Sequence, residues 1–353
     1  MYVMSKIKIL NYHLMLSFIL KISMRKSLFL ILISYSLSIF SFEFSVMTLN
    51  AQNLFDTIDD PKKNDKAYLP IELKQSKKHI NSCNTIKVKS WKDECLNLDW
   101  DEQTKNTKLR NLVSEILKYD NSGPDILALQ EVENFNILSQ LFNLLEPHGY
   151  KHFALVEGDD YRGIDNAIIS KFNIIDTKLH YISFTGDNED KDTRPIMEST
   201  LIVNDKKLKI YNVHFPAGYH PVSMRIDSLN TLRSLLDQHQ YPSIALGDFN
   251  INQKEDSQLG IYASQEKSWS IAHLVGCDDC RGTHYYSYGN SWSFLDTIFL
   301  SQDRGVSYIP DSITVHVTET NSYSEFQKPK RFDPITGKGV SDHFPVVAKL
   351  IFD

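Results

Sequence analysis

The sequence lacks the excess of basic side chains that is typical of proteins held on nucleic acid by bulk charge. Its 353 residues contain 38 Lys and Arg against 44 Asp and Glu, which gives a formal net charge of −6. A protein that binds phosphates through its overall charge is basic. The composition therefore excludes tight non-specific DNA binding by bulk charge, and it leaves open a local phosphate site supported by metal ions.

The N-terminal region has no apolar run long enough to cross a membrane. Residues 28–40 are apolar apart from serines and a tyrosine, whereas a membrane span needs about 20 apolar residues. The run follows the basic residues of 24–26 and precedes small residues suited to peptidase cleavage, namely Ser36, Ser38 and Ser41. We therefore predict a signal peptide over residues 1–41, with an uncleaved anchor as the alternative.

The same segment sets the expected location of the protein. Residues 1–23 are interpreted as an upstream extension, with Met24 as the true initiator. Loss of residues 1–41 removes no acidic side chain and makes the remainder more acidic, because the segment carries Lys6, Lys8, Lys21, Arg25 and Lys26. We expect a secreted or periplasmic bacterial protein that is monomeric and has no stable membrane association after cleavage.

Cysteine is scarce, and its placement favours structural bridges. The chain has four cysteines, Cys83, Cys95, Cys277 and Cys280, and an even number in an exported chain suggests disulfides. Three pairings are allowed, of which local Cys83–Cys95 and Cys277–Cys280 bridges are the simplest. Cys277-Asp-Asp-Cys280 could also be half a zinc site or a redox pair, but no second Cys-x-x-Cys accompanies it.

The sequence has no internal repeat and no low-complexity linker, and strand-like and helix-like stretches alternate along it. Such alternation, with hairpins among the strands, predicts one α/β domain at 42–353, built from two packed mixed sheets flanked by helices. A polar, lysine-rich segment at 56–104 is too long for an ordinary connection and is interpreted as a surface insertion or a substrate-facing loop. Helices are expected at 105–119, 134–145 and 221–238, and strands at 44–50, 125–129, 151–157, 166–170, 174–183, 198–203, 207–214, 243–246, 292–300, 306–309, 312–317 and 344–352.

Clusters of polar residues share one placement, because each of them stands at an end of a predicted strand. Strand ends on one side of a sandwich converge in space, so these residues are expected to share one site. The clusters are at 48–56, 125–131, 211–215, 245–250, 294–299 and 341–343.

These clusters resemble, in their order along the chain, the motifs of the endonuclease/exonuclease/phosphatase superfamily, which has the deoxyribonuclease I and exonuclease III fold. The resemblance covers 44–352 and is nearest to a bacterial branch whose first motif reads Asn-x-x-Asn-Leu-Phe-Asp, here 50–56. The segments 56–61, 282–286 and 292–296 also resemble that branch. The resemblance implies a four-layer αββα sandwich and a divalent-metal-dependent phosphoesterase.

The resemblance assigns metal binding to Glu131, Asn50 and Asp342. Glu131 would be the main carboxylate ligand of Mg²⁺, with Mn²⁺ or Ca²⁺ as alternatives, and Asn50 would support the site through its side-chain carbonyl. Asp342 would face the metal and phosphate region. Position 52 is Gln where the branch often has an acid, which leaves the number of metal ions open.

The resemblance implies that five residues carry the catalysis. Asp248 would position or deprotonate the attacking water, and Asn250, two residues on, would face the same way and bind a phosphate oxygen. His343 would contact the water or the phosphate. Its orienting carboxylate is expected to be Asp296 rather than the adjacent Asp342, because neighbouring side chains on an extended segment diverge. His214 would donate to the phosphate or act as general acid.

Four further residues are predicted at the substrate. Arg194 and Arg162 are candidate phosphate-binding guanidinium groups. Asp165 is the candidate acid that pairs with His214, and Asn212 belongs to the Asn-x-His pattern that precedes that histidine.

The predicted function is that of a Mg²⁺-dependent phosphodiesterase, an endonuclease or exonuclease acting on DNA rather than RNA. The alternative is a lipid or inositol phosphoesterase of the sphingomyelinase type, and the third candidate is a binding module that has lost activity. The 285–288 stretch is aromatic but polar, which suits base stacking better than insertion into lipid.

Overall fold

The computed structural model describes residues 41–323 and 327–352, and residues 43–353 form one compact unit. The predicted signal peptide and the start at Met24 lie outside the described residues, except for Ser41. Within the described ranges, no helix has both the length and the apolar character that a membrane crossing requires.

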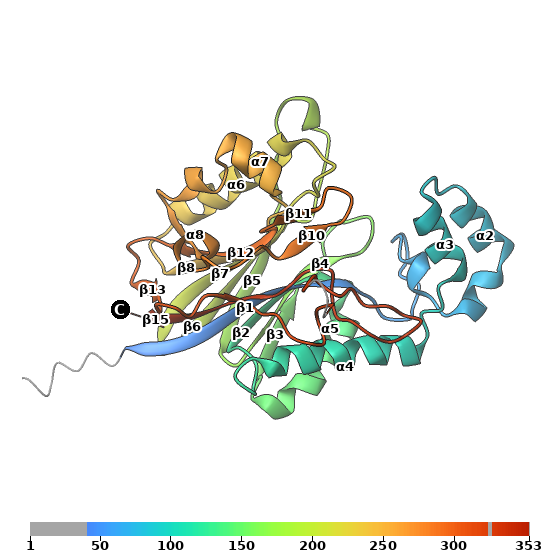
Figure 1. The fold of residues 1–353 in the computed structure, drawn as a ribbon, viewed down its shortest axis with the longest axis horizontal. Coiled ribbons are helices and arrows are strands. Elements are labelled where there is room, and N and C mark those ends of the chain that lie inside the picture. The colour runs from blue at the N-terminus through green and yellow to red at the C-terminus, as the bar shows by residue number, and fades with distance from the viewer. Residues whose placement is uncertain (1–40, 324–326, 353) are drawn as a thin grey trace, which may run out of the picture. The chain divides into compact units, whose positions relative to one another are not determined.

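Two mixed sheets face each other and carry the fold (Figure 1). The first has the order β13-β15-β1-β2-β4-β3, with β14 also paired to β15, and the second has the order β5-β6-β7-β8-β12-β9. The strands of the first sheet are β1 (Phe42–Leu54), β2 (Ile126–Val132), β3 (His152–Leu155), β4 (Asp165–Ser170), β13 (Val306–Tyr308), β14 (Thr314–Val315) and β15 (Val346–Phe352). Those of the second are β5 (Asn173–His180), β6 (Ile196–Val203), β7 (Lys206–His214), β8 (Ser243–Asp248), β9 (Trp269–Ile271) and β12 (Asp296–Ser301).

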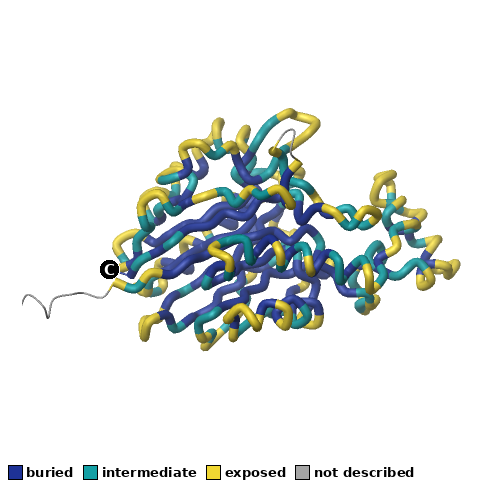
Figure 2. The backbone as a smooth tube through the Cα atoms, turned by 60° about the horizontal axis from the view of Figure 1, so that its bottom comes forward, coloured by how far each residue is buried: buried dark blue, intermediate teal, exposed yellow. Residues whose placement is uncertain are grey.

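Helices cover the outer face of each sheet, which gives the four layers expected from the resemblance. Helices α4 (Glu102–Lys118) and α5 (Phe135–Leu145) pack on the first sheet, and α6 (Val222–Asp237) packs on the second. Two shorter helices, α7 (Gln253–Leu259) and α8 (Ala272–Val275), lie on the side of α6. The central strands are buried along most of their length (Figure 2), whereas β3 and β5 are only partly buried, so the apolar core lies within and on both sides of the sheets.

Helix α4 shows how local sequence positions these layers. The Asp101 side chain accepts the Thr104 backbone N–H at 2.8 Å and caps the helix, so the helix begins three residues before the predicted 105. Leu109, Leu112 and Ile116 recur at helical spacing and are buried against β1 and β2.

The segment 56–104, interpreted from the sequence as a surface insertion or a substrate-facing loop, contains short helices. It contains the 3₁₀ turns η1 (Lys66–Tyr68) and η2 (Ile71–Gln75) and the helices α2 (Lys77–Asn84) and α3 (Lys89–Asn97). Each helix is only two or three turns long, so it leaves little periodic signal in the sequence. The Cys83–Cys95 disulfide joins α2 to α3, and a second bridge joins Cys277 to Cys280, the local pairing that was judged simplest.

One predicted strand is divided in the structure. Residues expected as a single strand at 292–300 form β11 (Ser291–Ser293), which pairs with β10 (His284–Tyr286), and β12, which belongs to the second sheet. The break falls at 294–295, where the Leu295 carbonyl accepts the Phe249 N–H at 2.7 Å. Because of this break, a separate hairpin stands beside the end of the second sheet.

Candidate active site

Three polar side chains occupy the same level of neighbouring strands in the second sheet. His214 ends β7 and is in register with Asp248 at the end of β8, and Asp248 is in register with Asp296 at the start of β12. Strands β7 and β8 are parallel, so both carboxyl ends point to one side of the sheet. The predicted convergence of the strand ends is therefore present.

The first sheet reaches the same place through two facing bulges. Register shifts occur between Asn50 and Leu54 on β1 and between Leu129 and Val132 on β2. Gln52, Asn53, Glu131 and Asn250 all have a positive φ, which is uncommon for residues other than glycine. Strained backbone of this kind is retained where it redirects a side chain, and here it turns the Glu131 carboxylate towards β8.

Gly247 is required for the close approach of β7 and β8. Its φ is 142°, and a Cβ built on it would lie 2.0 Å from the Val213 carbonyl oxygen. No larger residue fits this position, which directly precedes Asp248. The Gly-Asp sequence therefore sets the packing of the strand as well as the position of the carboxylate.

Asn50 joins the two acidic residues from the two sheets. Its side-chain amide donates to Asp248 Oδ2 at 3.1 Å and to Glu131 Oε1 at 3.5 Å, and its Oδ1 accepts the Gln52 N–H at 2.9 Å. Glu131 Oε2 also accepts the Asn53 N–H at 2.8 Å. Asn50, which was predicted to offer its carbonyl oxygen to a metal, thus faces the carboxylates with its NH₂ group, because this donor satisfies the buried Asp248 and the partly buried Glu131.

His343 is paired with Asp296, as predicted, and not with its neighbour Asp342. Its Nδ1 lies 2.7 Å from Asp296 Oδ2, and both side chains are buried. Burial alone would lower the pKa of His343, but the charge and hydrogen bond of Asp296, together with the charge of Asp248, hold it well above its usual range. The imidazole is therefore a cation at neutral pH.

Asp248 lies within 4.8 Å of this pair, measured between potential ligand atoms. Its burial, and then the negative charge of Asp296, raise the pKa of Asp248 to about 7, against opposing effects of His343 and of a hydrogen bond from the Asn250 N–H. A carboxyl group with this pKa takes up and releases a proton near neutral pH, as a general base must. Asn250 donates its side-chain NH₂ to the Phe215 carbonyl at 3.0 Å.

His214 has a different protonation state. Its Nε2 lies 3.7 Å from Asp248 Oδ2 and 3.9 Å from Glu131 Oε1. Burial, followed by the positive charges of Arg194 and Arg162, holds the pKa of His214 well below its usual range. The ring is therefore neutral at neutral pH, and its buried Nδ1 has no hydrogen-bond partner among the residues that the structure describes.

The predicted pairing of Asp165 with His214 is absent. Asp165 Oδ1 instead accepts the Gly158 N–H at 2.9 Å, and burial raises the pKa of Asp165 to about 7. The side chain is held by the loop that precedes β4, and it does not reach the Nδ1 atom of His214.

The predicted role of Asn212 at the substrate is also wrong. The residue is fully buried between the sheets, where its NH₂ donates to the carbonyls of Leu129 and Ala167 at 2.9 and 2.8 Å. Its Oδ1 accepts the Gln130 side-chain amide at 2.7 Å. All the polar atoms of its side chain bond to the first sheet, so it ties the sheets together.

The two arginines differ in their availability to a phosphate. Arg194 donates to the carbonyls of His214 and Phe215 and forms an ion pair with Asp160 at 3.4 Å, so it supports the loop after β7. Arg162 is exposed and donates to the Asn53 side chain, which adjoins Glu131. Of the two, Arg162 is the better placed to meet an anionic ligand.

Two residues near the site were missed in the sequence. Lys108 of α4 is buried, donates to the Val340 carbonyl at 3.4 Å, and has its pKa lowered to about 7 by burial despite the charges of Asp342 and Glu131. His284 lies with its ring centroid 5.0 Å from that of His343, and burial lowers its pKa to about 4. Lys108 could have been found because it is a lysine on the apolar face of a predicted helix. His284 could have been found because it lies within the 282–286 motif.

The residues of the site fit a divalent cation. Glu131 and Asp248, which both accept from the Asn50 amide, supply the hard oxygen ligands that Mg²⁺ and similar ions prefer. The potential ligand atoms of Asp248, Asp296 and His343 lie within 4.8 Å of one another. The raised pKa of Asp248 shows that its negative charge is incompletely compensated by the protein. Burial would raise the pKa of Asp342, but the charges of His343, Arg331 and His284 keep it low, so this carboxylate is ionised and able to bind a cation. Gln52, in place of an acid, accepts the Phe332 N–H at 3.0 Å.

Two facing mixed sheets, with carboxylates and a cationic histidine where their strand ends meet, define the class of α/β-sandwich hydrolases. Residues 96–343 match the model of the Endonuclease/Exonuclease/phosphatase family, and the chain belongs to this family. Its members are phosphoester hydrolases that generally use divalent metal ions. A comparison with curated proteins gives no match.

Solved structures similar to this chain share its fold. A Bacteroides thetaiotaomicron protein of the same family is 20% identical with a TM-score of 0.55, covering 89% of this chain and 99% of its own. A mannosyl-6-phosphatase of B. thetaiotaomicron is 18% identical with a TM-score of 0.54, covering 88% and 100%. D. rerio TDP2, complexed with a single-strand DNA product, is 16% identical with a TM-score of 0.55, covering 87% and 98%.

Proposed function

We propose that this protein is a secreted or periplasmic, Mg²⁺-dependent phosphodiesterase that cleaves DNA. The observation that supports hydrolysis best is the arrangement of Asp248 beside the His343–Asp296 pair, with Glu131 on the facing sheet. It combines a carboxylate that titrates near neutral pH with an imidazole that is held protonated. Hydrolysis of a phosphodiester needs both functions, a base for water and a positive charge for the phosphate.

The two groups divide the reaction between them. Asp248 takes a proton from the water whose oxygen forms the new bond to phosphorus. His343 stays protonated and stabilises the negative charge that develops on the phosphate oxygens as the bond to the leaving oxygen breaks. His214 is neutral and acts by hydrogen bonding to the phosphate, and the leaving oxygen takes its proton from solvent.

Bound Mg²⁺ would supply Lewis-acid activation of the phosphate. Glu131 and Asp342 are the residues that would hold it, and Asn50 keeps the Glu131 and Asp248 carboxylates in place through its NH₂ group. Arg162 adds a guanidinium at the edge of the site, where a further phosphate of a polymer can bind.

Aromatic residues near His343 favour a nucleic acid over a small phosphoester. The turn of the β10–β11 hairpin exposes Tyr286 and Tyr288, the latter 95% exposed. The backbone of His284, in the same hairpin, forms an antiparallel β-bridge with that of His343. Exposed aromatic rings bind bases by stacking. The similar fold of a DNA-bound TDP2 is consistent with this substrate, whereas that of a mannosyl-6-phosphatase keeps a sugar phosphate among the substrates to be tested.

Export is proposed on the basis of the predicted signal peptide and the two disulfides. Disulfides persist in oxidising compartments. Detection of the protein in culture medium or periplasm, with its N-terminus near residue 42, would support export. Retention of residues 1–41 in a membrane fraction would contradict it.

One assay tests the activity. The purified protein is incubated with supercoiled plasmid, mannose 6-phosphate, sphingomyelin or phosphoinositides, with Mg²⁺ or with EDTA. We expect the plasmid to be cut with Mg²⁺ alone, and Asp248→Asn to slow cutting by roughly 10²–10⁴-fold. Hydrolysis of a lipid or of mannose 6-phosphate with the plasmid left intact would refute the nuclease assignment.

A further inference from the structure

The tip of the insertion has a charge distribution unlike that of the rest of the chain. We propose that this lysine tip, defined as residues 76–92, binds the phosphate backbone of a nucleic acid whose scissile phosphodiester lies in the active site. The inference rests on the proposed function and names a surface that holds the same substrate away from the reacting bond.

The tip concentrates unpaired positive charge. Residues 76–92 contain no Asp or Glu, whereas the chain as a whole is acidic. No described carboxylate lies within ion-pair distance of the tip ammonium groups, although lysines elsewhere, such as Lys118 and Lys171, are paired. The tip lysines are Lys77, Lys78, Lys87, Lys89 and Lys92, of which the first four are exposed.

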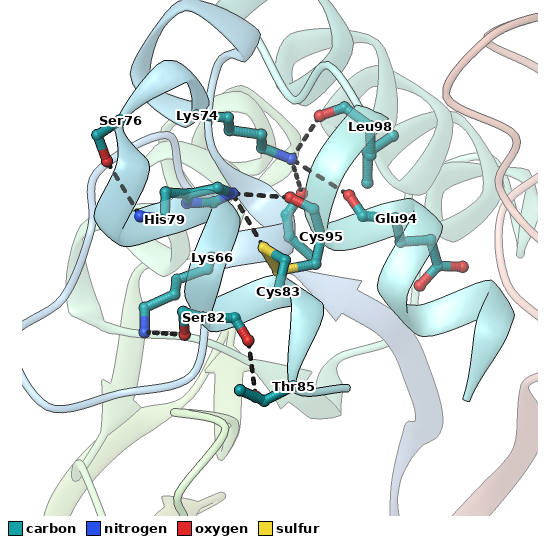
Figure 3. Close-up of a disulfide and its surroundings, with 11 residues drawn as sticks. Lys66, Lys74, Ser76, His79, Ser82, Cys83, Thr85, Glu94, Cys95 and Leu98 are labelled. Carbon is teal, nitrogen blue, oxygen red and sulfur yellow. Dashed lines mark hydrogen bonds between the residues drawn. A yellow bond between two sulfur atoms is a disulfide. The ribbon is translucent and has the colours of Figure 1, made fainter. Parts of the chain in front are cut away.

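Cross-links make the tip a rigid platform (Figure 3). The Cys83–Cys95 disulfide joins α2 and α3, and His79 Nε2 lies 2.8 Å from the Cys95 carbonyl oxygen. Beneath them, the buried Lys74 ammonium donates to the carbonyls of Ala67 and Glu94 at 2.8 and 3.3 Å, and to that of Leu98. Burial lowers the pKa of Lys74 to about 8, which marks it as structural and unlike the exposed tip lysines.

Apolar side chains on the tip favour stacking with bases. Trp91 is 59% exposed on α3, and Val88 and Ile80 are also exposed. Three apolar side chains among lysines are too few to insert into a membrane, whereas one aromatic ring beside phosphate-binding cations suits a nucleic acid. Charge complementarity therefore favours a polyanion with bases over a lipid surface.

The base of the insertion adjoins the active site. Tyr68 of η1 stacks on Phe55 with ring centroids 4.1 Å apart, and Phe55 follows the bulge that holds Glu131. The charges of Arg162 and Glu131 act on the Tyr68 hydroxyl, although burial has the larger effect and raises its pKa. A polymer bound at Glu131 can therefore extend along the insertion to the tip, which a short substrate does not reach.

The test separates binding from cleavage. Binding of a fluorescein-labelled 30-base-pair DNA is measured by anisotropy in EDTA, over a series of salt concentrations, for the wild type and for the tip variant K77Q/K78Q/K87Q/K89Q. We expect affinity to fall at least about tenfold and the slope of log K against log salt to decrease by roughly 3, since each lost phosphate contact contributes about 0.9. The Trp91→Ala variant should weaken binding without changing the slope.

A matched control carries the same change of charge elsewhere. K151Q/K206Q/K207Q/K267Q removes four exposed lysines at the ends of strands opposite the active site, and it should bind DNA as the wild type does. Both quadruple variants should hydrolyse the small diester bis(4-nitrophenyl) phosphate with unchanged kcat/KM, which shows that the site is intact. The tip variant alone should raise KM for plasmid.

Three outcomes overturn the proposal. The tip variant binds DNA as tightly as the wild type does, or both quadruple variants lose the same amount of DNA affinity. In the third, the tip variant loses binding to phosphatidylglycerol vesicles while its DNA binding is unchanged. A protein that binds DNA through the tip in EDTA but leaves it uncut with Mg²⁺ would refute the proposed nuclease function and not the binding surface. The two claims therefore fail independently.

Discussion

At the scale of single residues, the site depends on the charge of Asp296. This buried carboxylate raises the pKa of both His343 and Asp248. In the proposed reaction, Asp248 accepts a proton and His343 must keep one. We expect the rate to rise with pH as Asp248 loses its proton and to fall as His343 loses its own. The charge of Asp296 therefore affects the pKa values that set both the rising and the falling limb of the pH–rate profile.

We predict that Asp296→Asn moves the whole profile to lower pH. The amide keeps a hydrogen bond to His343 but removes the charge, so the pKa of the histidine and that of Asp248 both fall. The kcat should decrease by roughly 10²–10⁴-fold at pH 8 and by less at pH 6. Plasmid cleavage from pH 5 to 9 measures this, with the exposed Asp303→Asn as control. A profile reduced in height without a shift would contradict the prediction.

The sequence supported some of these residue assignments better than others. Asp342 could be set aside because adjacent side chains on extended backbone diverge, a local rule that needs no tertiary information, and the resemblance then implied Asp296. Asn212 and Asp165 were misassigned, because their partners lie on strands and loops that are distant in the sequence. The neutral state of His214 also depends on burial and on two arginines, and none of these is encoded locally.

At the scale of elements, the two sheets are joined by a side chain. Asn212 of β7 satisfies the Leu129 and Ala167 carbonyls and the Gln130 side chain of the facing sheet. Its removal leaves several buried polar groups without partners, and each costs about 1–3 kcal/mol.

We predict that Asn212→Ala lowers the free energy of unfolding by about 3–5 kcal/mol. Because the residue does not face the substrate, KM for plasmid at 20 °C should remain that of the wild type. Urea denaturation and initial rates measure the two effects. A large rise in KM with unchanged stability would restore the substrate-binding role that the sequence suggested.

The insertion depends on its own cross-link. The Cys83–Cys95 bridge closes a short loop with a sequence separation of 12, and such a bridge contributes about 3 kcal/mol. We predict that C83S/C95S exposes the lysine tip to trypsin while the sandwich remains folded. C277S/C280S serves as the matched control and should be cut no faster at the tip than the wild type. Equal cleavage of both variants would show that the tip does not require its bridge.

Elements were predictable to the extent that their pattern was periodic. Helices α4, α5 and α6 and most of the longer strands carry apolar patterns and occur close to where the sequence places them, whereas the three-residue strands β9 and β10 were not predicted. Helices α2 and α3 are too short to show such a pattern and gain their order from a disulfide. The facing bulges of β1 and β2 were not predictable, since they arise from the pairing of two strands some 80 residues apart.

At the scale of the whole molecule, buried ionisable groups set the pH dependence of stability. Burial raises the pKa of four carboxyl groups above the value of about 4 expected in the unfolded chain. Their contribution to the free energy of unfolding is fully present below pH 4, where the groups are neutral in both states. It is lost as pH rises through their pKa values in the folded protein. These are about 6 for Asp65, about 7 for Asp165 and Asp248, and about 9 for Glu133.

Buried histidines act in the opposite direction. Burial lowers the pKa of His273 and His284 to about 4, so their contribution is present above pH 6.5 and is lost as pH falls towards 4. The two effects oppose each other between pH 4 and 6.5. Above pH 6.5 the contribution of His273 and His284 is constant, and the carboxyl contribution continues to fall.

We therefore predict that the Tm of Glu133→Gln in EDTA exceeds that of the wild type by a margin that grows from pH 6.5 to 9. The side-chain amide of this variant retains an oxygen to accept the Asp56 N–H, which Glu133 Oε2 accepts at 2.7 Å, but it carries no charge to bury. At pH 9 the variant should unfold roughly 3 °C or more above the wild type, corresponding to about 2 kcal/mol, with little difference at pH 5. Differential scanning fluorimetry measures this, with the exposed Glu266→Gln as control. If the difference in Tm between the variant and the wild type were the same at all pH values, ionisation of Glu133 would not destabilise the folded protein.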